Sequence, residues 1–146
     1  MGTINLYLTF DGNCEEAFNF YKLVFGGEFE QISRFGDMPP NPEYPVKERD
    51  KNKIMHVSLA IGKESVLMGC DKASGFGDAL NKGNNFAISV SQDSPKEADK
   101  IFEELSEGGE VRMPMGKMFW GAYFGMFIDK FGLSWMVSAP LAKDEN

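Results

Sequence analysis

Apolar residues follow two different spacings along the first part of the chain, and the change of spacing separates a strand from a helix. The run Ile4–Phe10 is short and rich in β-favouring residues, and an apolar stripe at helical spacing follows it as far as Phe25. Asn13 precedes the stripe with Glu16 three residues later, an arrangement similar to a capping box, and Gly26-Gly27 follows the stripe. We therefore expect a strand, then a helix that Asn13 caps and the glycines end.

Three further strands are expected in the first half, over Glu28–Phe35, Ile54–Ile61 and Ser65–Asp71. The segment Gly36–Lys53 separates the first two and holds four of the seven prolines of the chain. Such a segment forms neither a helix nor a central strand, so we expect a long polar loop. This loop is either a lid over a binding site or a solvated excursion.

The second half repeats this succession. Its helix and strands are expected at these positions: a strand over Asn85–Val90, a helix from Pro95 to about Ser106, and strands over Glu110–Met113, Phe119–Ile128 and Leu133–Val137. Asp93 or Ser94 is expected to cap the helix, and Asp129 to Gly132 suits a type I turn that ends on a left-handed glycine.

The repeat is also visible residue by residue in the two predicted helices. One offset, 81, relates the apolar pairs Ala17 and Ala98, Phe20 and Ile101, Tyr21 and Phe102, and Val24 and Leu105. Repeated units of this kind bury one continuous core. The sequence therefore predicts an α+β fold of two βαβββ modules, about 1–80 and about 81–146.

The last two strands are apolar on both faces. Strict alternation places Trp120, Phe124, Met126 and Trp135 on one face, and Phe119, Tyr123, Phe127 and Met136 on the other. A strand that is apolar on both sides is covered on both sides, so we expect one face to pack under a helix. The other face is expected to line a cavity or a second sheet.

Length and charge narrow the possible classes. A chain of 146 residues fits one domain, and a net charge of -7 without a basic stripe argues against nucleic acid as a partner. The start MGTINLYLTF has no basic segment and no long apolar run, and no stretch is long enough to span a bilayer. We expect a soluble cytoplasmic protein without a membrane partner.

Three stretches of the chain carry a resemblance to a known family. They are YLTFDGNCEEAFNFYKLVFGGEF, then KIMHVSLAIG followed by LMGCD, and MPMGKMFWGAYFGMFIDKFGLSWMV. With the two βαβββ modules, they resemble the PhnB-like branch of the vicinal oxygen chelate superfamily, which includes glyoxalase I, bleomycin-resistance proteins and extradiol dioxygenases. The resemblance implies a cupped mixed sheet with the helices outside, and a homodimer whose module edges complete one another's cups.

The same branch often carries the label of a 3-demethylubiquinone-9 3-methyltransferase. No Gly-rich loop with an acidic residue for a nucleoside follows the first strand, so the residues do not support S-adenosylmethionine chemistry. In the metal-using relatives, four side chains hold a divalent ion in the cup. The resemblance places these positions at Leu6, Leu67 or Met68, Asn85 and Met136, which are mostly apolar, so neither a metal nor another cofactor is expected.

Individual residues allow both a functional and a structural interpretation. His56 is the one histidine of the chain. In a functional interpretation it is a general base or a ligand-binding group, because its unperturbed pKa lies near neutrality. In a structural interpretation it is a strand histidine with one hydrogen-bond partner. Cys14 and Cys70 have no metal or redox spacing and are interpreted as packed thiols. Phe119, Tyr123 and their aromatic neighbours either stack on a ligand or fill the core.

The first hypothesis is a metal-free protein that binds a small apolar or aromatic molecule in the cup. Its expected ligand-binding residues are Phe10, His56, Asn85, Phe119, Tyr123 and Met136. The second hypothesis is a metal-dependent lyase, isomerase or dioxygenase of the same superfamily, with His56 as base. The third is a dimeric interaction module whose cup is filled by its own side chains.

Overall fold

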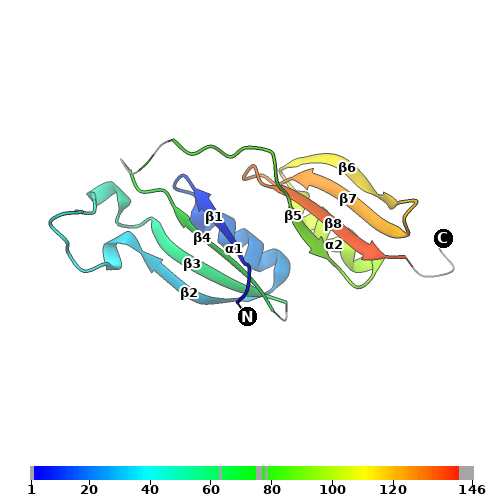
Figure 1. The fold of residues 1–146 in the computed structure, drawn as a ribbon, viewed down its shortest axis with the longest axis horizontal. Helices are drawn as coiled ribbons and strands as arrows, with labels where there is room; N and C mark the ends of the chain where they lie inside the picture. The colour runs from blue at the N-terminus through cyan, green and yellow to red at the C-terminus, as the bar shows by residue number, and fades with distance from the viewer. Residues whose placement is uncertain (1, 63, 75–76, 78, 142–146) are drawn as a thin grey trace. The chain divides into compact units, whose positions relative to one another are not determined.

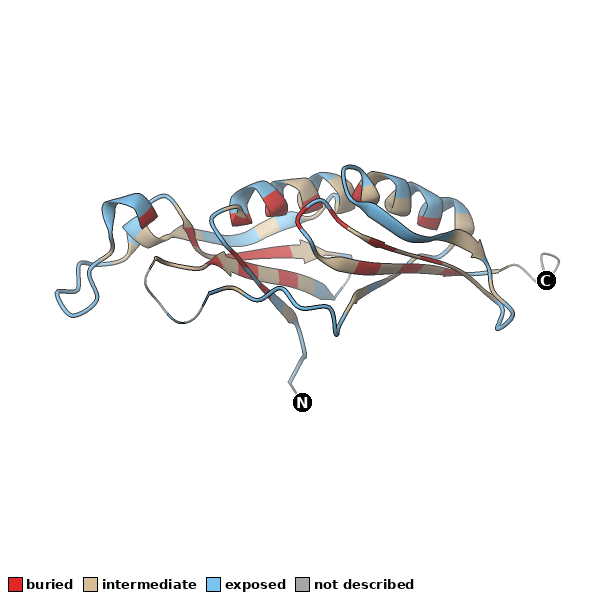
Figure 2. Ribbon diagram, turned by 90° about the horizontal axis from the view of Figure 1, so that it is seen from above, coloured by how far each residue is buried: buried red, intermediate tan, exposed pale blue. Residues whose placement is uncertain are grey.

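The chain is made of two compact units, Met1–Leu80 and Asn81–Asn146, and each is described by itself (Figure 1). The computed structural model describes residues 2–62, 64–74, 77 and 79–141. In each unit one helix lies along one face of a sheet, and buried positions recur where the two meet (Figure 2). Each unit therefore has a covered face and an opposite face.

The first unit has a four-stranded mixed sheet. Its elements are β1 (Leu6–Phe10), α1 (Cys14–Phe25), β2 (Glu28–Arg34), the 3-10 turns η1 (Phe35–Asp37) and η2 (Glu48–Asp50), β3 (Ile54–Ile61) and β4 (Ser65–Asp71). The strand order is β1-β4-β3-β2, with β1 parallel to β4 and the other neighbours antiparallel.

The second unit repeats this topology. Its elements are β5 (Ile88–Ser91), α2 (Pro95–Ser106), β6 (Glu110–Lys117), β7 (Ala122–Ile128) and β8 (Ser134–Pro140), in the order β5-β8-β7-β6. Here β5 is parallel to β8, as β1 is to β4. The predicted α+β fold with two βαβββ modules is confirmed, and the described strands pair as two four-stranded sheets, one in each unit.

Two consecutive glycines end α1, for two different physical reasons. Gly26 adopts a left-handed conformation (φ 74°), and its N–H donates to the Lys22 carbonyl at 2.7 Å. Gly27 lies so close to β3 that a Cβ atom would overlap the Ala60 carbonyl oxygen. The glycine that follows α2 by three residues, Gly109, approaches the β7 carbonyl oxygen of Ile128 in the same way.

The capping predicted at the start of α1 is wrong, because the Asn13 side chain makes no capping hydrogen bond. Asp71 takes that role from the far end of β4, where it is 2% exposed. Its Oδ1 accepts the N–H groups of Gly12 (3.0 Å) and Cys14 (2.9 Å), and its Oδ2 accepts that of Ile54 (2.9 Å). One buried carboxylate therefore joins the helix start to the first residue of β3.

The structure corrects the limits of the predicted last hairpin. Phe119 and Trp120 lie in a tight turn, in which the Met118 N–H donates to the Ala122 carbonyl at 2.8 Å, and β7 begins only after this turn. The strand before it, β6, continues through Pro114 to Lys117. An edge strand tolerates a proline, and the β6–β7 register shifts on both sides of Met113.

The predicted division of apolar residues between the two faces of this hairpin is also wrong. Trp135 is the cross-strand partner of Phe127, and Met136 is the partner of Met126. The turn sets this register, and a slip by one residue exchanges the faces of a strand. The predicted turn itself is confirmed: Gly132 has φ 90°, and its N–H donates to the Asp129 carbonyl at 2.9 Å.

Candidate functional site

The face of the first sheet opposite α1 is the candidate site, and we call it the open face. A Cβ on Gly69 would touch the Phe18 ring of α1, so Gly69 points toward the helix. Its neighbours Met68 and Cys70 therefore point to the open face, as does Tyr7, the cross-strand partner of Met68. Within the described part of this unit, no helix covers these side chains.

A hydrogen-bonded pair of side chains, Tyr7 and His56, spans the open face. The Tyr7 hydroxyl lies 3.2 Å from His56 Nδ1, and the two rings are tilted by 31° with centroids 5.7 Å apart. Burial, together with a hydrogen bond to the Cys70 thiol, raises the pKa of the Tyr7 phenol to about 12. Tyr7 therefore keeps its proton at neutral pH.

The protonated phenol allows two states of the imidazole. When Tyr7 donates to Nδ1, a neutral His56 carries its proton on Nε2 and presents a hydrogen-bond donor. When Tyr7 instead accepts from Nδ1, Nε2 is a free acceptor and can act as a base. Among the described residues, Tyr7 is the one hydrogen-bond partner of the His56 ring.

Ser33 on β2 contributes a further polar group to the same face. It is the cross-strand partner of His56, and directly opposed residues point to the same side of a sheet. Its Oγ is buried, and among the buried side-chain oxygen and nitrogen atoms of the described residues it is the one without a hydrogen-bond partner. A buried hydroxyl without a partner is destabilising, and an acceptor on a bound ligand would satisfy it once the Ser33 side chain rotates toward the open face.

The corresponding face of the second sheet is rich in sulfur. Trp135 and Val137 are buried on the α2 side, so Met136 between them points to the other face, with its cross-strand partners Met126 and Ser89. Flexible thioethers adapt to differently shaped apolar partners.

The structure distributes the six predicted ligand-binding residues over different environments. Phe10 is 4% exposed on the α1 side and makes an edge-to-face contact with Phe18, so it faces away from His56. Tyr123 donates its hydroxyl proton to Asp99 of α2, which places it on the face opposite Met136. That hydrogen bond, together with burial, raises the pKa of Tyr123 to about 12.

The other predicted residues are accessible within their units. Phe119 is 98% exposed in the turn before β7 and contacts Trp120 edge to face, and Asn85 is exposed in a bend before β5. His56 and Met136 are half-buried on faces opposite the helices. Ligand binding by these six residues stays a prediction, and their positions favour His56 and Met136 over Phe10 and Tyr123.

Sequence reasoning missed Tyr7 and Ser33 as members of the site. Strand alternation around the buried Leu8 and Phe10 could have placed Tyr7 on the open face. No local signal marks Ser33, because its position opposite His56 depends on the irregular β2–β3 register.

The side chains at the superfamily's metal positions do not fit a divalent ion. Leu6 and Leu67 are cross-strand partners in β1 and β4, and neither leucine offers a ligand atom. Met136 offers one thioether and Asn85 one amide. In the described ranges, no three His, Cys, Asp or Glu side chains gather into a possible metal site. None of the helices described is long and apolar enough to cross a membrane.

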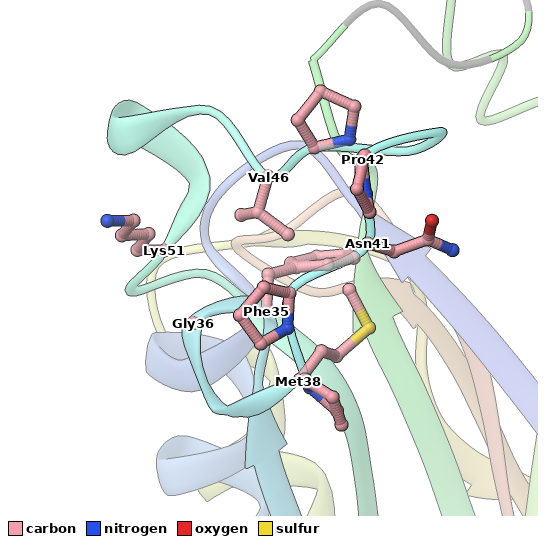
Figure 3. Close-up of a pocket in the computed structure, with 10 residues that line it drawn as sticks. Phe35, Gly36, Met38, Asn41, Pro42, Val46 and Lys51 are labelled. Atoms are coloured by element: carbon pink, nitrogen blue, oxygen red, sulfur yellow. The ribbon is translucent and has the colours of Figure 1, made fainter.

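The long loop between β2 and β3 forms two mainly apolar hollows, the second together with the residues that follow β4. Their volumes are about 420 and about 340 Å³, and both are lined by Phe35, Met38, Pro45 and Val46. In the larger hollow, Met38 and Val46 point inward near Phe35, whereas the Asn41 amide points outward (Figure 3). Neither predicted role of the loop, lid or solvated excursion, is tested by this geometry.

Comparison with known proteins gives consistent matches along nearly the whole chain. A family model described as 3-demethylubiquinone-9 3-methyltransferase matches residues 3–138. Protein YjdN of Escherichia coli K12 is 26% identical over 142 residues, which cover 90% of this chain and 91% of YjdN.

Two solved structures are also similar over nearly their full length. Protein PA1353 from Pseudomonas aeruginosa has a TM-score of 0.82 at 41% identity, covering 96% of this chain and 98% of PA1353. The PhnB protein from Bacillus cereus, a putative 3-demethylubiquinone-9 3-methyltransferase, has a TM-score of 0.73 at 25% identity, covering 94% of this chain and 99% of that protein.

Proposed function

Because the chain belongs to the 3-demethylubiquinone-9 3-methyltransferase family, the PhnB-like branch of the vicinal oxygen chelate superfamily, we propose that it binds a small molecule on the open face without a metal ion. One observation carries this proposal: the Tyr7–His56 pair lies beside the buried, unpartnered hydroxyl of Ser33. The ligand would be an apolar or aromatic molecule with at least one hydrogen-bond acceptor.

The proposed contacts follow from the chemistry of the face. An acceptor on the ligand would receive a hydrogen bond from His56 Nε2 while Tyr7 donates to Nδ1. The same acceptor, or a second one, would satisfy the Ser33 hydroxyl. Met68 and the Tyr7 ring would provide apolar contact for the rest of the molecule.

The turn between β1 and α1 does not offer the free groups that the nucleoside cofactor of a methyltransferase needs. A nucleoside cofactor held at a strand-to-helix turn needs free backbone N–H groups there. In this chain the N–H groups of Gly12 and Cys14 at that turn are bonded to Asp71. The turn therefore serves the fold.

We also propose that the protein is a cytoplasmic homodimer. Phe119 and Trp120 are 98% and 57% exposed, and an exposed aromatic cluster is typical of a contact surface. Sedimentation velocity tests this: a monomer at micromolar concentration, both with and without ligand, would contradict the proposal.

A thermal-shift screen of small aromatic and aliphatic carboxylates, phenols and ketones tests ligand binding. A ligand that binds the native state raises its stability by RT ln(1 + [L]/Kd), so a hit raises Tm. We expect His56→Ala and Ser33→Ala to weaken each hit about tenfold or more, since each removes a hydrogen-bonding group. Thr9→Val, on the same face at an exposed position, is the matched control.

Two outcomes would contradict the proposal. The first is a set of hits that bind wild type and His56→Ala equally well. The second is the presence of one transition-metal ion per chain in wild-type protein purified without chelator, together with loss of that ion in His56→Ala. This result would favour the metal-dependent alternative.

A further inference from the structure

The smaller hollow in the loop, about 340 Å³, has the features of a ligand site. We call it the loop pocket. It is lined by Phe35, Met38, Tyr44, Pro45, Val46, Lys47, Asp50, Lys72, Ala73 and Ser74. Its volume lies in the range of small-molecule sites. None of these residues belongs to the Tyr7, His56 and Ser33 cluster, so the two sites are distinct.

The base of the loop is held by backbone hydrogen bonds, which fixes the two ends of the segment that lines the pocket. The Phe35 N–H donates to the Lys53 carbonyl at 3.1 Å, and the Gly36 N–H donates to the Lys51 carbonyl at 2.9 Å. The Lys72 N–H donates to the Phe10 carbonyl of β1 at 2.7 Å, which fixes the backbone after β4. Pro45 has a fixed φ, so its part of the wall loses little entropy when a ligand binds.

The charged groups of the loop pocket favour an anion. Lys47 and Lys72 both line it, and neither forms an ion pair with a described carboxylate. The one carboxylate of the lining, Asp50, is already satisfied: it pairs with Lys53 Nζ at 2.9 Å and accepts hydrogen bonds from the Ser74 N–H (3.1 Å) and hydroxyl (2.8 Å).

The protonation state of Asp50 agrees with this arrangement. Burial acts to raise the pKa of Asp50, but the hydrogen bonds from Lys53 and Ser74 outweigh it and hold that pKa below its usual range. Asp50 is therefore ionised and neutralised by Lys53 at neutral pH. Lys47, which is exposed, and Lys72, which is half-buried, therefore line an apolar wall without an ion pair to any described carboxylate, in a chain whose net charge is -7.

We propose that the loop pocket is a second binding site, which takes a small amphipathic anion. The apolar or aromatic body of the ligand lies against Phe35, Met38 and Val46. Its carboxylate, sulfonate or phosphate group is held by Lys47 and Lys72.

Two fluorescent probes with the same aromatic body test the proposal on the full chain. 8-Anilinonaphthalene-1-sulfonate carries an anionic group, and N-phenyl-1-naphthylamine lacks it. NMR spectra of protein with methyl-labelled methionine show where the sulfonate probe binds. The Met38 signal is assigned as the one that is missing from the spectrum of Met38→Leu. We expect the Met38 signal to shift with the fluorescence increase and to saturate with it. A Met38 signal that stays fixed while the sulfonate probe saturates would overturn the pocket as the site.

A pair of charge variants tests the selectivity for an anion. Lys47→Gln with Lys72→Gln should weaken the sulfonate probe about tenfold, because each partly exposed ion pair contributes a factor of a few, and should leave the neutral probe within about twofold. Lys96→Gln with Lys100→Gln, two exposed lysines of α2, gives the same change in net charge and should weaken neither probe. Equal losses in both double variants would overturn the proposed role of the two lysines.

The variants Val46→Asp and His56→Ala show whether the sulfonate probe binds in the loop pocket or on the open face. Val46→Asp places a carboxylate in the apolar wall and should weaken the sulfonate probe more than tenfold. His56→Ala should leave the Met38 shift unchanged. If Val46→Asp has no effect while His56→Ala abolishes binding, the sulfonate probe occupies the open face, and the loop pocket is refuted without harm to the proposed function.

Discussion

Replacement of Asp71 by alanine should destabilise the protein more than any other single carboxylate substitution we propose. The variant removes the acceptor of three backbone N–H groups, those of Gly12, Cys14 and Ile54. Cys14 and Ile54 are fully buried, and each unsatisfied buried N–H costs about 1–3 kcal/mol. Gly12 is exposed to water, and we count about 0.5 kcal/mol for it. The expected loss is therefore about 4.5 kcal/mol, the middle of a range of about 2.5–6.5 kcal/mol. It is a large part of the about 5–15 kcal/mol that stabilises a typical domain.

Urea unfolding followed by far-UV circular dichroism measures this loss. With a slope of about 2 kcal/mol/M, the unfolding midpoint should fall by about 2 M. Asp71→Asn keeps one acceptor oxygen and should lose about half as much. Asp11→Ala, a neighbouring exposed carboxylate, is the control and should stay within about 0.5 kcal/mol of wild type. A loss below about 1 kcal/mol in Asp71→Ala would refute the reasoning that this carboxylate caps α1.

Three other substitutions or measurements follow from the structure. Gly27→Ala should lower the free energy of unfolding by about 3 kcal/mol, because its Cβ would overlap a β3 carbonyl oxygen; a urea midpoint equal to that of wild type would contradict this. Burial raises the pKa of the Cys14 thiol, so at pH 8 a thiol reagent should label one cysteine quickly, and Cys70→Ser should abolish that phase. Spectrophotometric titration should show Tyr123 ionising near pH 12, and Asp99→Asn should lower that pKa; an unchanged titration curve would exclude the hydrogen bond as its cause.

The sequence predicted the elements whose limits depend on local signals. Both helices have the expected extents, because Ser94 caps α2 through the Glu97 N–H (3.3 Å) and Gly26 adopts the left-handed conformation that ends α1. The strands β3 and β4 also have the predicted limits. The limits of β6 were not predictable from Pro114 alone, because a proline is tolerated there only at an edge, and the edge position is a property of the whole sheet.

The candidate site depends on distant residues, and only part of it was predictable. His56 was identified as the one histidine, but its partner Tyr7 lies 49 positions away in the sequence. The capping role of Asp71 was likewise not predictable from the sequence. Even the nearest N–H group that it binds, that of Ile54, is 17 positions away. Pattern and propensity report on neighbours along the chain, whereas these contacts arise when strands pair.

The two-faced construction of the first sheet has a consequence for how such a protein can diverge. Leu8, Val57 and Leu59 are buried on the α1 side, where a changed side chain alters folding. Tyr7 and His56 lie on the other side at half-exposed or exposed positions, where a replacement has little effect on the core. Selection for stability and selection for a new ligand therefore act on different, interleaved positions of the same strands. A duplicated gene could change its specificity in single steps while every intermediate still folds.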